Sequence, residues 1–215
     1  MIIDTDEIVV KRMEPGAKLD ASSSALVIID MMNRFCDAKW LANGDEQKEQ
    51  WFEDGLDQII PNLQLVLEDF RACGGLVVHV VNAKWTESGR DVVPYQRGRD
   101  YELFDSHPMS VIEPLAPKQG EVVIRKVASS AFTATGLEFI LRNAGIDTVF
   151  LGGQYGGACV LYSLIQSREL GFENFWIDDA ILYGSEKNKA MVEALVGSQW
   201  ATMASAKDVV HALSQ

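Results

Sequence analysis

The sequence predicts an α/β fold: a doubly wound sheet of about six mostly parallel strands with helices on both faces, in three layers. Strand-like apolar runs alternate with stretches of helical spacing along the chain. The first such run, 25–30, is apolar until it ends in an acid, which is typical of a parallel strand buried on both faces. The length of 215 residues suits one domain with a full core, so we expect a single domain over 1–215.

Each element is expected from its own pattern. After the strand at 25–30, apolar residues recur at helical spacing over 56–70, with Pro61 near the start of that helix and glycines at 74 and 75 ending it. The other expected elements, in order, are strands at 76–81 and 121–125, a helix over 136–143, a strand at 148–151, a helix over 158–170, a strand at 174–177, a helix near 186–196, a strand near 200–203 and a final helix from about 207.

Two long segments, 37–54 and 83–119, interrupt this alternation. Structureless loops of such length are uncommon in compact domains unless they cover a site, although simple surface elaboration is the alternative. Both segments leave the carboxyl ends of strands, where open α/β sheets bind their ligands. We therefore expect 83–119 to form a long loop that covers the site, and 1–24 to form an N-terminal arm.

Composition excludes several classes of partner. The net charge of −12, from 19 basic and 31 acidic residues, argues against nucleic acid or an anionic membrane surface as a partner. No apolar run approaches the roughly 20 residues of a membrane span, and the acidic N-terminus does not resemble a signal peptide. Three widely spaced cysteines indicate neither a disulfide framework nor a zinc site. We expect a cytoplasmic protein in a reducing compartment.

The strand at 148–151 runs into a glycine-rich bend, and Cys159 follows where a helix should begin. The free N–H groups and partial positive charge of a helix N-terminus favour a thiolate and can hold an oxyanion, although a packed structural cysteine is the alternative. Asp30 and Lys126 end two other strands. Alone, each is readily explained as a turn cap or a solvated lysine. Together, the three side chains supply a nucleophile, a base and a charged group that orients them.

Three motifs, in the right order and spacing, resemble those of the isochorismatase-like cysteine hydrolases. This family includes nicotinamidases, N-carbamoylsarcosine amidases and ureide hydrolases. The motifs are Ala-Leu-Val-Ile-Ile-Asp30-Met-Met-Asn33-Arg-Phe35, then Val-Ile-Arg-Lys126-Val-Ala-Ser-Ser130-Ala-Phe132, then Leu-Gly-Gly-Gln154-Tyr155-Gly-Gly-Ala-Cys159-Val. The resemblance covers about 25–205. It departs from the family at Met32, where glutamine is usual, at Arg34, where a second acid is usual, and at Gly156, where threonine is common.

The resemblance implies a cysteine amidohydrolase that cleaves a small linear amide, carbamoyl or ureide C–N bond through a thioester. Cys159 would attack the carbonyl, Asp30 would carry the proton, and Lys126 would keep Asp30 ionised. It also implies a cis peptide bond between Gln154 and Tyr155, with the N–H groups of Tyr155 and Cys159 forming the oxyanion hole. Family members are usually dimers or tetramers, so we expect a homo-oligomer.

Five residues are candidates for the substrate pocket: Phe35, Trp85, Arg97, Phe132 and Gln154. The aromatic and arginine content of 83–107 suggests a small, planar, carboxylated amide or carbamoyl compound.

We expect no metal and no other cofactor. The three histidines, His79, His107 and His211, form no His-x-His pair of the kind that holds the metal of nicotinamidases. Nicotinamide is therefore not favoured as a substrate.

Three other functions remain open at this point. Isochorismatase itself hydrolyses a vinyl ether by acid chemistry and does not need the thiol. A dinucleotide-binding domain is disfavoured because Gln154 takes the place of the middle glycine of the G-x-G-x-x-G motif. A non-catalytic binding protein on the same fold would have no reason to keep Asp30, Lys126 and Cys159 together.

Overall fold

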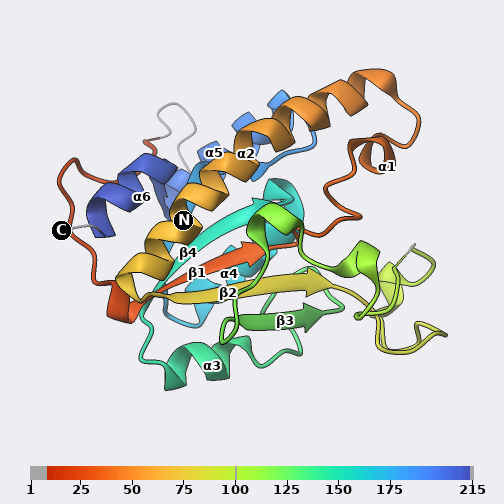
Figure 1. Cartoon of the computed structure of the whole chain (residues 1–215). Coiled ribbons are helices and arrows are strands. Elements are labelled where there is room, and N and C mark those ends of the chain that lie inside the picture. Colours follow the sequence, from red (N-terminus) through yellow and green to blue (C-terminus); the bar gives the residue numbers. More distant parts are fainter. Residues whose placement is uncertain (1–8, 100, 214–215) are drawn as a thin grey trace.

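The computed structural model describes residues 9–99 and 101–213, and within them the strands form one fully parallel sheet (Figure 1). The strand order is β3-β2-β1-β4-β5-β6, and every pairing is parallel. The strands are β1 (Ser24–Ile29), β2 (Leu76–Asn82), β3 (Val122–Lys126), β4 (Thr148–Gln154), β5 (Glu173–Leu182) and β6 (Thr202–Ala204). The predicted fold class is confirmed.

Helices cover both faces of the sheet. Alternate side chains of β1 point to opposite faces, as the pleat requires. Leu26 and Ile28 pack with α2 (Glu46–Cys73) and α6 (Ala206–Leu213). Ala25, Val27 and Ile29 pack on the other face, whose helices are α3 (Leu137–Asn143), α4 (Leu161–Glu169) and α5 (Glu186–Gln199). In the described residues no helix is both long and apolar enough to span a bilayer.

The prediction that 37–54 is an irregular segment was wrong. It contains α1 (Ala38–Ala42) and the first turns of α2. The sequence carried a signal for this: Asp37 and Asp45 are N-caps whose side chains accept hydrogen bonds from the first N–H groups of each helix. Because α2 begins at Glu46, Pro61 lies in the middle of the helix and not near its start.

The segment 83–119 contains three short 3-10 turns and packs over the chain that follows β1. The turns are Pro94–Gln96, His107–Met109 and Glu113–Leu115. The Asn33 amide donates to the Ser110 carbonyl at 3.0 Å, and the Ile112 amide donates to the Met31 carbonyl at 3.0 Å. These bonds fix the segment next to the carboxyl end of β1.

The expected N-terminal arm lies beside β6. The backbone N–H of Met203 donates to the Lys11 carbonyl at 2.8 Å, and the backbone N–H of Met13 donates to the Met203 carbonyl at 2.9 Å. Residues 1–8 of that arm lie outside the described residues.

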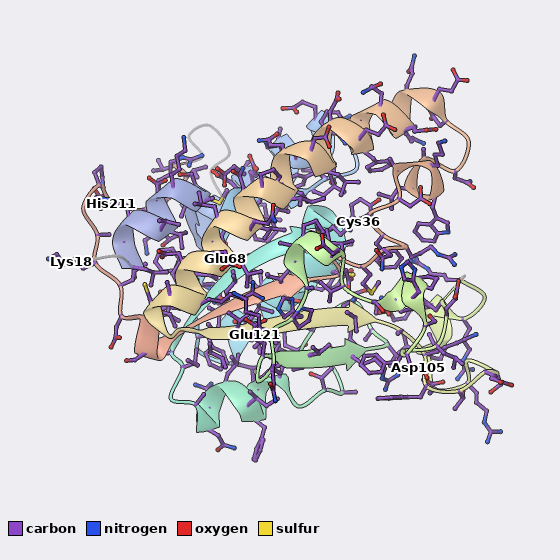
Figure 2. The ribbon with its side chains drawn as sticks, viewed as in Figure 1. Lys18, Cys36, Glu68, Asp105, Glu121 and His211 are labelled. Atoms are coloured by element: carbon purple, nitrogen blue, oxygen red, sulfur yellow. The ribbon has the colours of Figure 1, made fainter. Side chains whose placement is uncertain are left out.

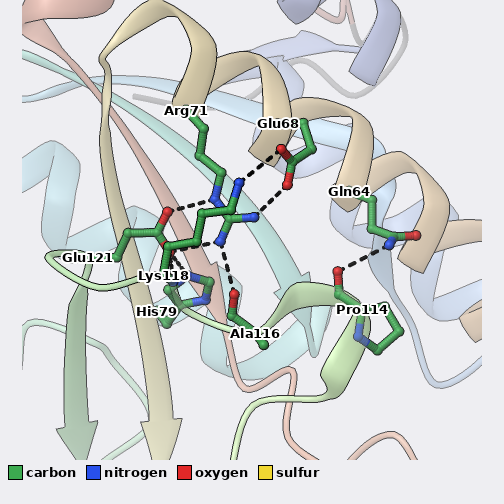
Figure 3. A network of polar contacts seen from close by, with 8 residues as sticks. All are labelled: Gln64, Glu68, Arg71, His79, Pro114, Ala116, Lys118 and Glu121. Carbon is green, nitrogen blue, oxygen red and sulfur yellow. Dashed lines mark hydrogen bonds and ion pairs between the residues drawn. The ribbon is translucent and has the colours of Figure 1, made fainter.

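A polar network joins α2 to β2 and to the turn before β3 (Figure 3). The Glu121 carboxylate accepts hydrogen bonds from Arg71 Nε at 2.6 Å and Arg71 Nη2 at 2.9 Å, and it also accepts from the backbone N–H of Lys118 at 2.8 Å. His79 Nε2 lies 3.2 Å from the same carboxylate. Burial lowers the pKa of His79, so the ring is neutral at pH 7. His79 therefore belongs to this polar network and not to the candidate site.

Glu121→Gln should lower the free energy of unfolding by about 2–3 kcal/mol at pH 7. Burial raises the pKa of Glu121, but Arg71, the Lys118 N–H and His79 outweigh it and lower that pKa to about 2. A carboxyl with a lowered pKa stabilises the fold fully above its ordinary pKa of 4.5 and loses that effect as the pH falls towards 2. The difference between wild type and variant should therefore shrink between pH 4.5 and pH 2 in urea unfolding.

Glu68→Gln is the matched control, because Glu68 also bonds Arg71 but its side chain is 61 % exposed. Exposed ion pairs contribute less than about 1 kcal/mol. Equal losses in the two variants would contradict the assignment of Glu121 as the centre of the network.

Candidate active site

The side chains of Asp30, Lys126 and Cys159 meet at the carboxyl edge of the sheet. Lys126 ends β3, Asp30 follows β1, and Cys159 follows β4. Lys126 Nζ lies 2.8 Å from Asp30 Oδ2 and donates to Cys159 Sγ at 3.2 Å and to the Ala128 carbonyl at 3.1 Å. The Lys126 ammonium therefore contacts both the Asp30 carboxylate and the Cys159 sulfur, the two groups between which a proton would pass.

The site is nearly sealed from solvent. Asp30 and Lys126 are each only 1 % exposed, whereas Cys159 is partly exposed. Asp30 Oδ1 has no hydrogen-bond partner among the fixed donors of the described residues. The thiol of Cys159, whose hydrogen can rotate, also interacts with the carboxylate. This carboxylate therefore has an oxygen available for a proton from the thiol.

The backbone of the site is set by two unusual conformations. Asp30 has φ 57°, in the left-handed region, which aspartate tolerates better than most residues. Gly153, one strand away, has φ 109°, and a Cβ there would lie 2.1 Å from the Ile29 carbonyl oxygen. Glycine at 153 thus permits β4 to lie against the end of β1, where Asp30 leaves the strand.

Burial and charge set the protonation of the three groups. Burial raises the pKa of Asp30, and Lys126 opposes this without cancelling it. Burial and the Asp30 charge raise the pKa of Cys159 to about 12, which outweighs the lowering by Lys126. Burial would lower the pKa of Lys126, but Asp30 and Cys159 raise it, so the ammonium keeps its charge. The resting sulfur is a thiol and not the thiolate that a helix start alone would favour.

Cys159 lies within a π-helical turn, Gly156–Val160, and not at the first turn of an α-helix. Helical structure thus begins at Gly156, close to the predicted start near 158, and α4 continues it from Leu161. The peptide bond between Gln154 and Tyr155, just before the turn, is cis. Ser163 Oγ donates to the Cys159 carbonyl at 2.7 Å and accepts from the Ala131 N–H at 2.9 Å, so it joins the turn to the loop after β3.

Two of the expected pocket residues lie beside these groups. Phe35 is half-buried, and its ring stacks on Trp40 with centroids 5.2 Å apart. Gln154 is fully buried, and its Nε2 donates to the carbonyls of Asp30 at 3.1 Å and Phe35 at 2.8 Å. The Gln154 amide thus supports the chain after β1. Figure 2 shows Cys36, from this same stretch, near the carboxyl ends of the strands, whereas Lys18 and His211 lie at the opposite end of the molecule.

Of the other three expected pocket residues, Phe132 belongs to the core cluster against which Cys159 packs, whereas Trp85 and Arg97 lie exposed on the loop 83–119. Trp85 is 57 % exposed and packs against Arg125, whose guanidinium carbon lies 4.3 Å from the ring centroid. Phe132 is buried in the core, with its ring 6.1 Å from that of Phe172. Arg97 is exposed on the loop 83–119, and its Nε donates to the Val92 carbonyl.

Asn82 and Tyr101 belong to the site although the sequence did not single them out. In the orientation that satisfies its neighbours, the Asn82 amide oxygen accepts from Lys126 Nζ at 3.2 Å and from Tyr101 Oη at 3.3 Å. Asn82 ends β2, between the strands of Asp30 and Lys126, so its place at a strand end was a usable signal. Tyr101 comes from the long loop, and no pattern distinguishes it from the other aromatic residues there.

No group of His, Cys, Asp or Glu in the described residues is arranged to hold a metal ion.

Comparison with known proteins identifies the family of this chain. The family model described as the isochorismatase domain matches residues 24–208. The chain belongs to the isochorismatase family. Within this family, the secreted isochorismatase effector Isc1 of Verticillium dahliae is 26 % identical over 201 residues, which cover 91 % of this chain and 94 % of that protein.

Relatives with hydrolase names also match. An N-carbamoylsarcosine amidase from an Arthrobacter species is 33 % identical over 124 residues, covering 55 % of this chain and 47 % of that protein. The crystal structure of a cysteine hydrolase from Pseudomonas syringae pv. phaseolicola superposes with a TM-score of 0.79 at 17 % identity, covering 96 % of this chain and 97 % of that one. The protein is thus an isochorismatase-family hydrolase with amidase-type relatives.

Proposed function

We propose that this isochorismatase-family hydrolase is a cysteine amidohydrolase that cleaves the C–N bond of a small linear amide, carbamoyl or ureide compound. The observation that carries the proposal is the position of Lys126 Nζ, which contacts the Asp30 carboxylate at 2.8 Å and the Cys159 sulfur at 3.2 Å. A thiol held beside a carboxylate and an ammonium supplies a nucleophile with its own base.

The first half of the reaction forms a thioester. The thiol proton of Cys159 passes to Asp30 as the sulfur bonds to the substrate carbonyl carbon, and negative charge develops on the carbonyl oxygen. Asp30 then gives that proton to the leaving nitrogen as the C–N bond breaks, which releases ammonia or an amine.

The second half returns the enzyme to its resting state. Asp30 takes a proton from water, the hydroxyl adds to the thioester carbon, and the C–S bond breaks. The proton returns to the sulfur, and a carboxylic or carbamic acid leaves. The raised pKa of Asp30 supports this cycle, because a carboxyl that binds its proton more strongly is a better base towards the thiol.

We assign the oxyanion hole to the backbone N–H groups of Tyr155 and Cys159, at the two sides of the glycine pair 156–157. The support is the family resemblance together with the π-helical turn, which Tyr155 precedes and which contains Cys159. The removal of one donor from an oxyanion hole lowers kcat by a factor of about 10²–10³.

A panel of substrates tests the proposal. Carbamoyl amino acids, ureides, maleamate-type amides and nicotinamide are each incubated with the enzyme, and ammonia is measured; isochorismate is incubated in parallel, and pyruvate is measured. We expect ammonia from at least one linear amide or ureide. Pyruvate without ammonia would instead indicate the vinyl-ether reaction. If neither ammonia nor pyruvate is released, the result favours a non-catalytic binding protein.

We also propose that the protein is cytoplasmic and forms a dimer or tetramer, in line with the family resemblance. Size-exclusion chromatography with light scattering measures the oligomeric state directly.

A further inference from the structure

A cavity of about 350 Å³ lies within the loop 83–119. Its walls carry mainly basic and amide side chains, and none of Asp30, Lys126 or Cys159 lines it. The lining residues that matter are Lys84, Arg90, Gln96, Arg97, Arg99 and Tyr101. The chain as a whole has a net charge of −12, whereas four basic side chains line this one cavity.

Within the described residues, acidic side chains do not pair with these cations. In the part of the chain that the structure describes, Arg90, Arg97 and Arg99 have no ion pair with an acidic side chain, and Lys84 Nζ donates only to the Glu87 carbonyl at 3.1 Å. The neighbouring Asp91 is engaged elsewhere, since its carboxylate pairs with Arg125 at 3.1 Å and accepts from the Trp85 N–H at 2.7 Å.

Gln96 gives independent evidence for a ligand. It lines the cavity but is only 2 % exposed, and its Oε1 has no hydrogen-bond partner among the described residues. A buried acceptor without a partner destabilises the fold, which favours a site where a ligand supplies the missing donor. A ligand with an O–H or N–H group would satisfy it.

Tyr101 links this cavity to the thiol site without merging the two. Its ring lines the cavity, while its hydroxyl reaches Asn82 at 3.3 Å, and Asn82 in turn contacts Lys126 at 3.2 Å. Tyr101 and Asn82 therefore connect the cavity to Lys126.

We propose that this cavity is an anion-binding site for a small ligand that carries a carboxylate or phosphate group next to an O–H or N–H donor. Guanidinium groups bind such oxyanions in a bidentate manner, and Gln96 Oε1 accepts the adjacent donor. The source of the anion is either the acidic end of the substrate or a separate small acid.

Inorganic phosphate and sulfate are suitable probes for the intact protein, because at pH 7 only phosphate has an O–H donor. Calorimetric or NMR titration should show phosphate binding more tightly than sulfate. The variant R90Q/R97Q/R99Q should weaken both by at least tenfold. The control K18Q/K187Q/K207Q removes three exposed lysines outside the cavity, so it has the same net charge and should bind as wild type does.

The Gln96→Leu variant isolates the amide. It should keep sulfate binding and lose the preference for phosphate. The proposal is overturned if the triple arginine variant binds phosphate as tightly as wild type, if the lysine control loses as much, or if wild type does not bind either anion. A preference for phosphate that survives in Gln96→Leu would overturn the role of Gln96.

Kinetics with an active substrate distinguish the two sources. If the acidic end of the substrate occupies the cavity, phosphate inhibits competitively, and R90Q/R97Q/R99Q raises KM for an acidic substrate but not for a neutral amide. If a separate acid occupies it, phosphate leaves KM unchanged. Binding is measured without turnover, so the absence of amide hydrolysis would refute the proposed function and leave this test intact.

Discussion

Cys159→Ala should reduce amide hydrolysis by at least about 10³-fold while the protein stays folded, because the substitution removes the only atom that bonds the acyl carbon. Loss of the Sγ contact with Lys126 leaves the ion pair to Asp30 at 2.8 Å, so the buried charges remain paired. Initial rates of ammonia release and far-UV circular dichroism provide the two measurements. Cys73→Ala, which removes an exposed thiol on α2, should retain full activity.

Cys159→Ser should be nearly as inactive as the alanine variant. Burial and the Asp30 charge already raise the pKa of the thiol to about 12, and an alcohol in the same place would be harder still to deprotonate. A serine variant that keeps most of the activity would show that the sulfur is a bystander and would favour the vinyl-ether reaction.

Asp30→Asn should lower amide hydrolysis by about 10³-fold or more and, at the same time, make Cys159 easier to alkylate at pH 6–7. The Asp30 charge raises the pKa of Cys159 and Lys126 lowers it, so the neutral amide leaves Lys126 to favour the thiolate. Alkylation needs only the thiolate, whereas amide cleavage also needs a proton for the leaving nitrogen. The rate of iodoacetamide labelling at Cys159, followed by peptide mass spectrometry, measures this separation.

Folding has to be checked in the same samples. An unpaired buried ammonium can destabilise a protein by about 3–5 kcal/mol, so circular dichroism and urea unfolding accompany the kinetics. Asp57→Asn, at an exposed position on α2, should change neither rate. If Asp30→Asn hydrolyses substrate within about tenfold of wild type, Asp30 only holds its left-handed turn and is not the proton carrier.

The parallel sheet and the meeting of the three reacting groups could be predicted from the sequence because both follow from strand order. Apolar runs ending in Asp30 and Lys126, and a bend leading to Cys159, place these residues at one edge once the strands are parallel. The early start of α2 was missed because its first turns, from Glu46, project from the sheet and lack the apolar periodicity of 56–70.

The identity of the residues around the site and the protonation of Cys159 depend on packing, which no local sequence pattern encodes. No sequence pattern separates Tyr101 from the other aromatic candidates, Trp85 and Phe132. Only Tyr101, through its hydroxyl, contacts Asn82 at the end of β2. The raised pKa of Cys159 follows from the burial of its own thiol and from the nearby Asp30 charge, and both depend on the whole fold.

The three proposed reacting groups come from separate strand ends, so the proposed activity depends on the alignment of those strands. Lys126 lies opposite Asn82 in the pairing of β3 with β2, and Gly153 lies opposite Ile29 in the pairing of β4 with β1. A shift of one residue in either pairing would turn the side chains to the other face of the sheet. A refolded sample could then regain its helical circular dichroism and much of its buried surface without regaining a working site. Titration of active sites therefore counts correctly aligned molecules, and its ratio to total protein measures the fidelity of refolding.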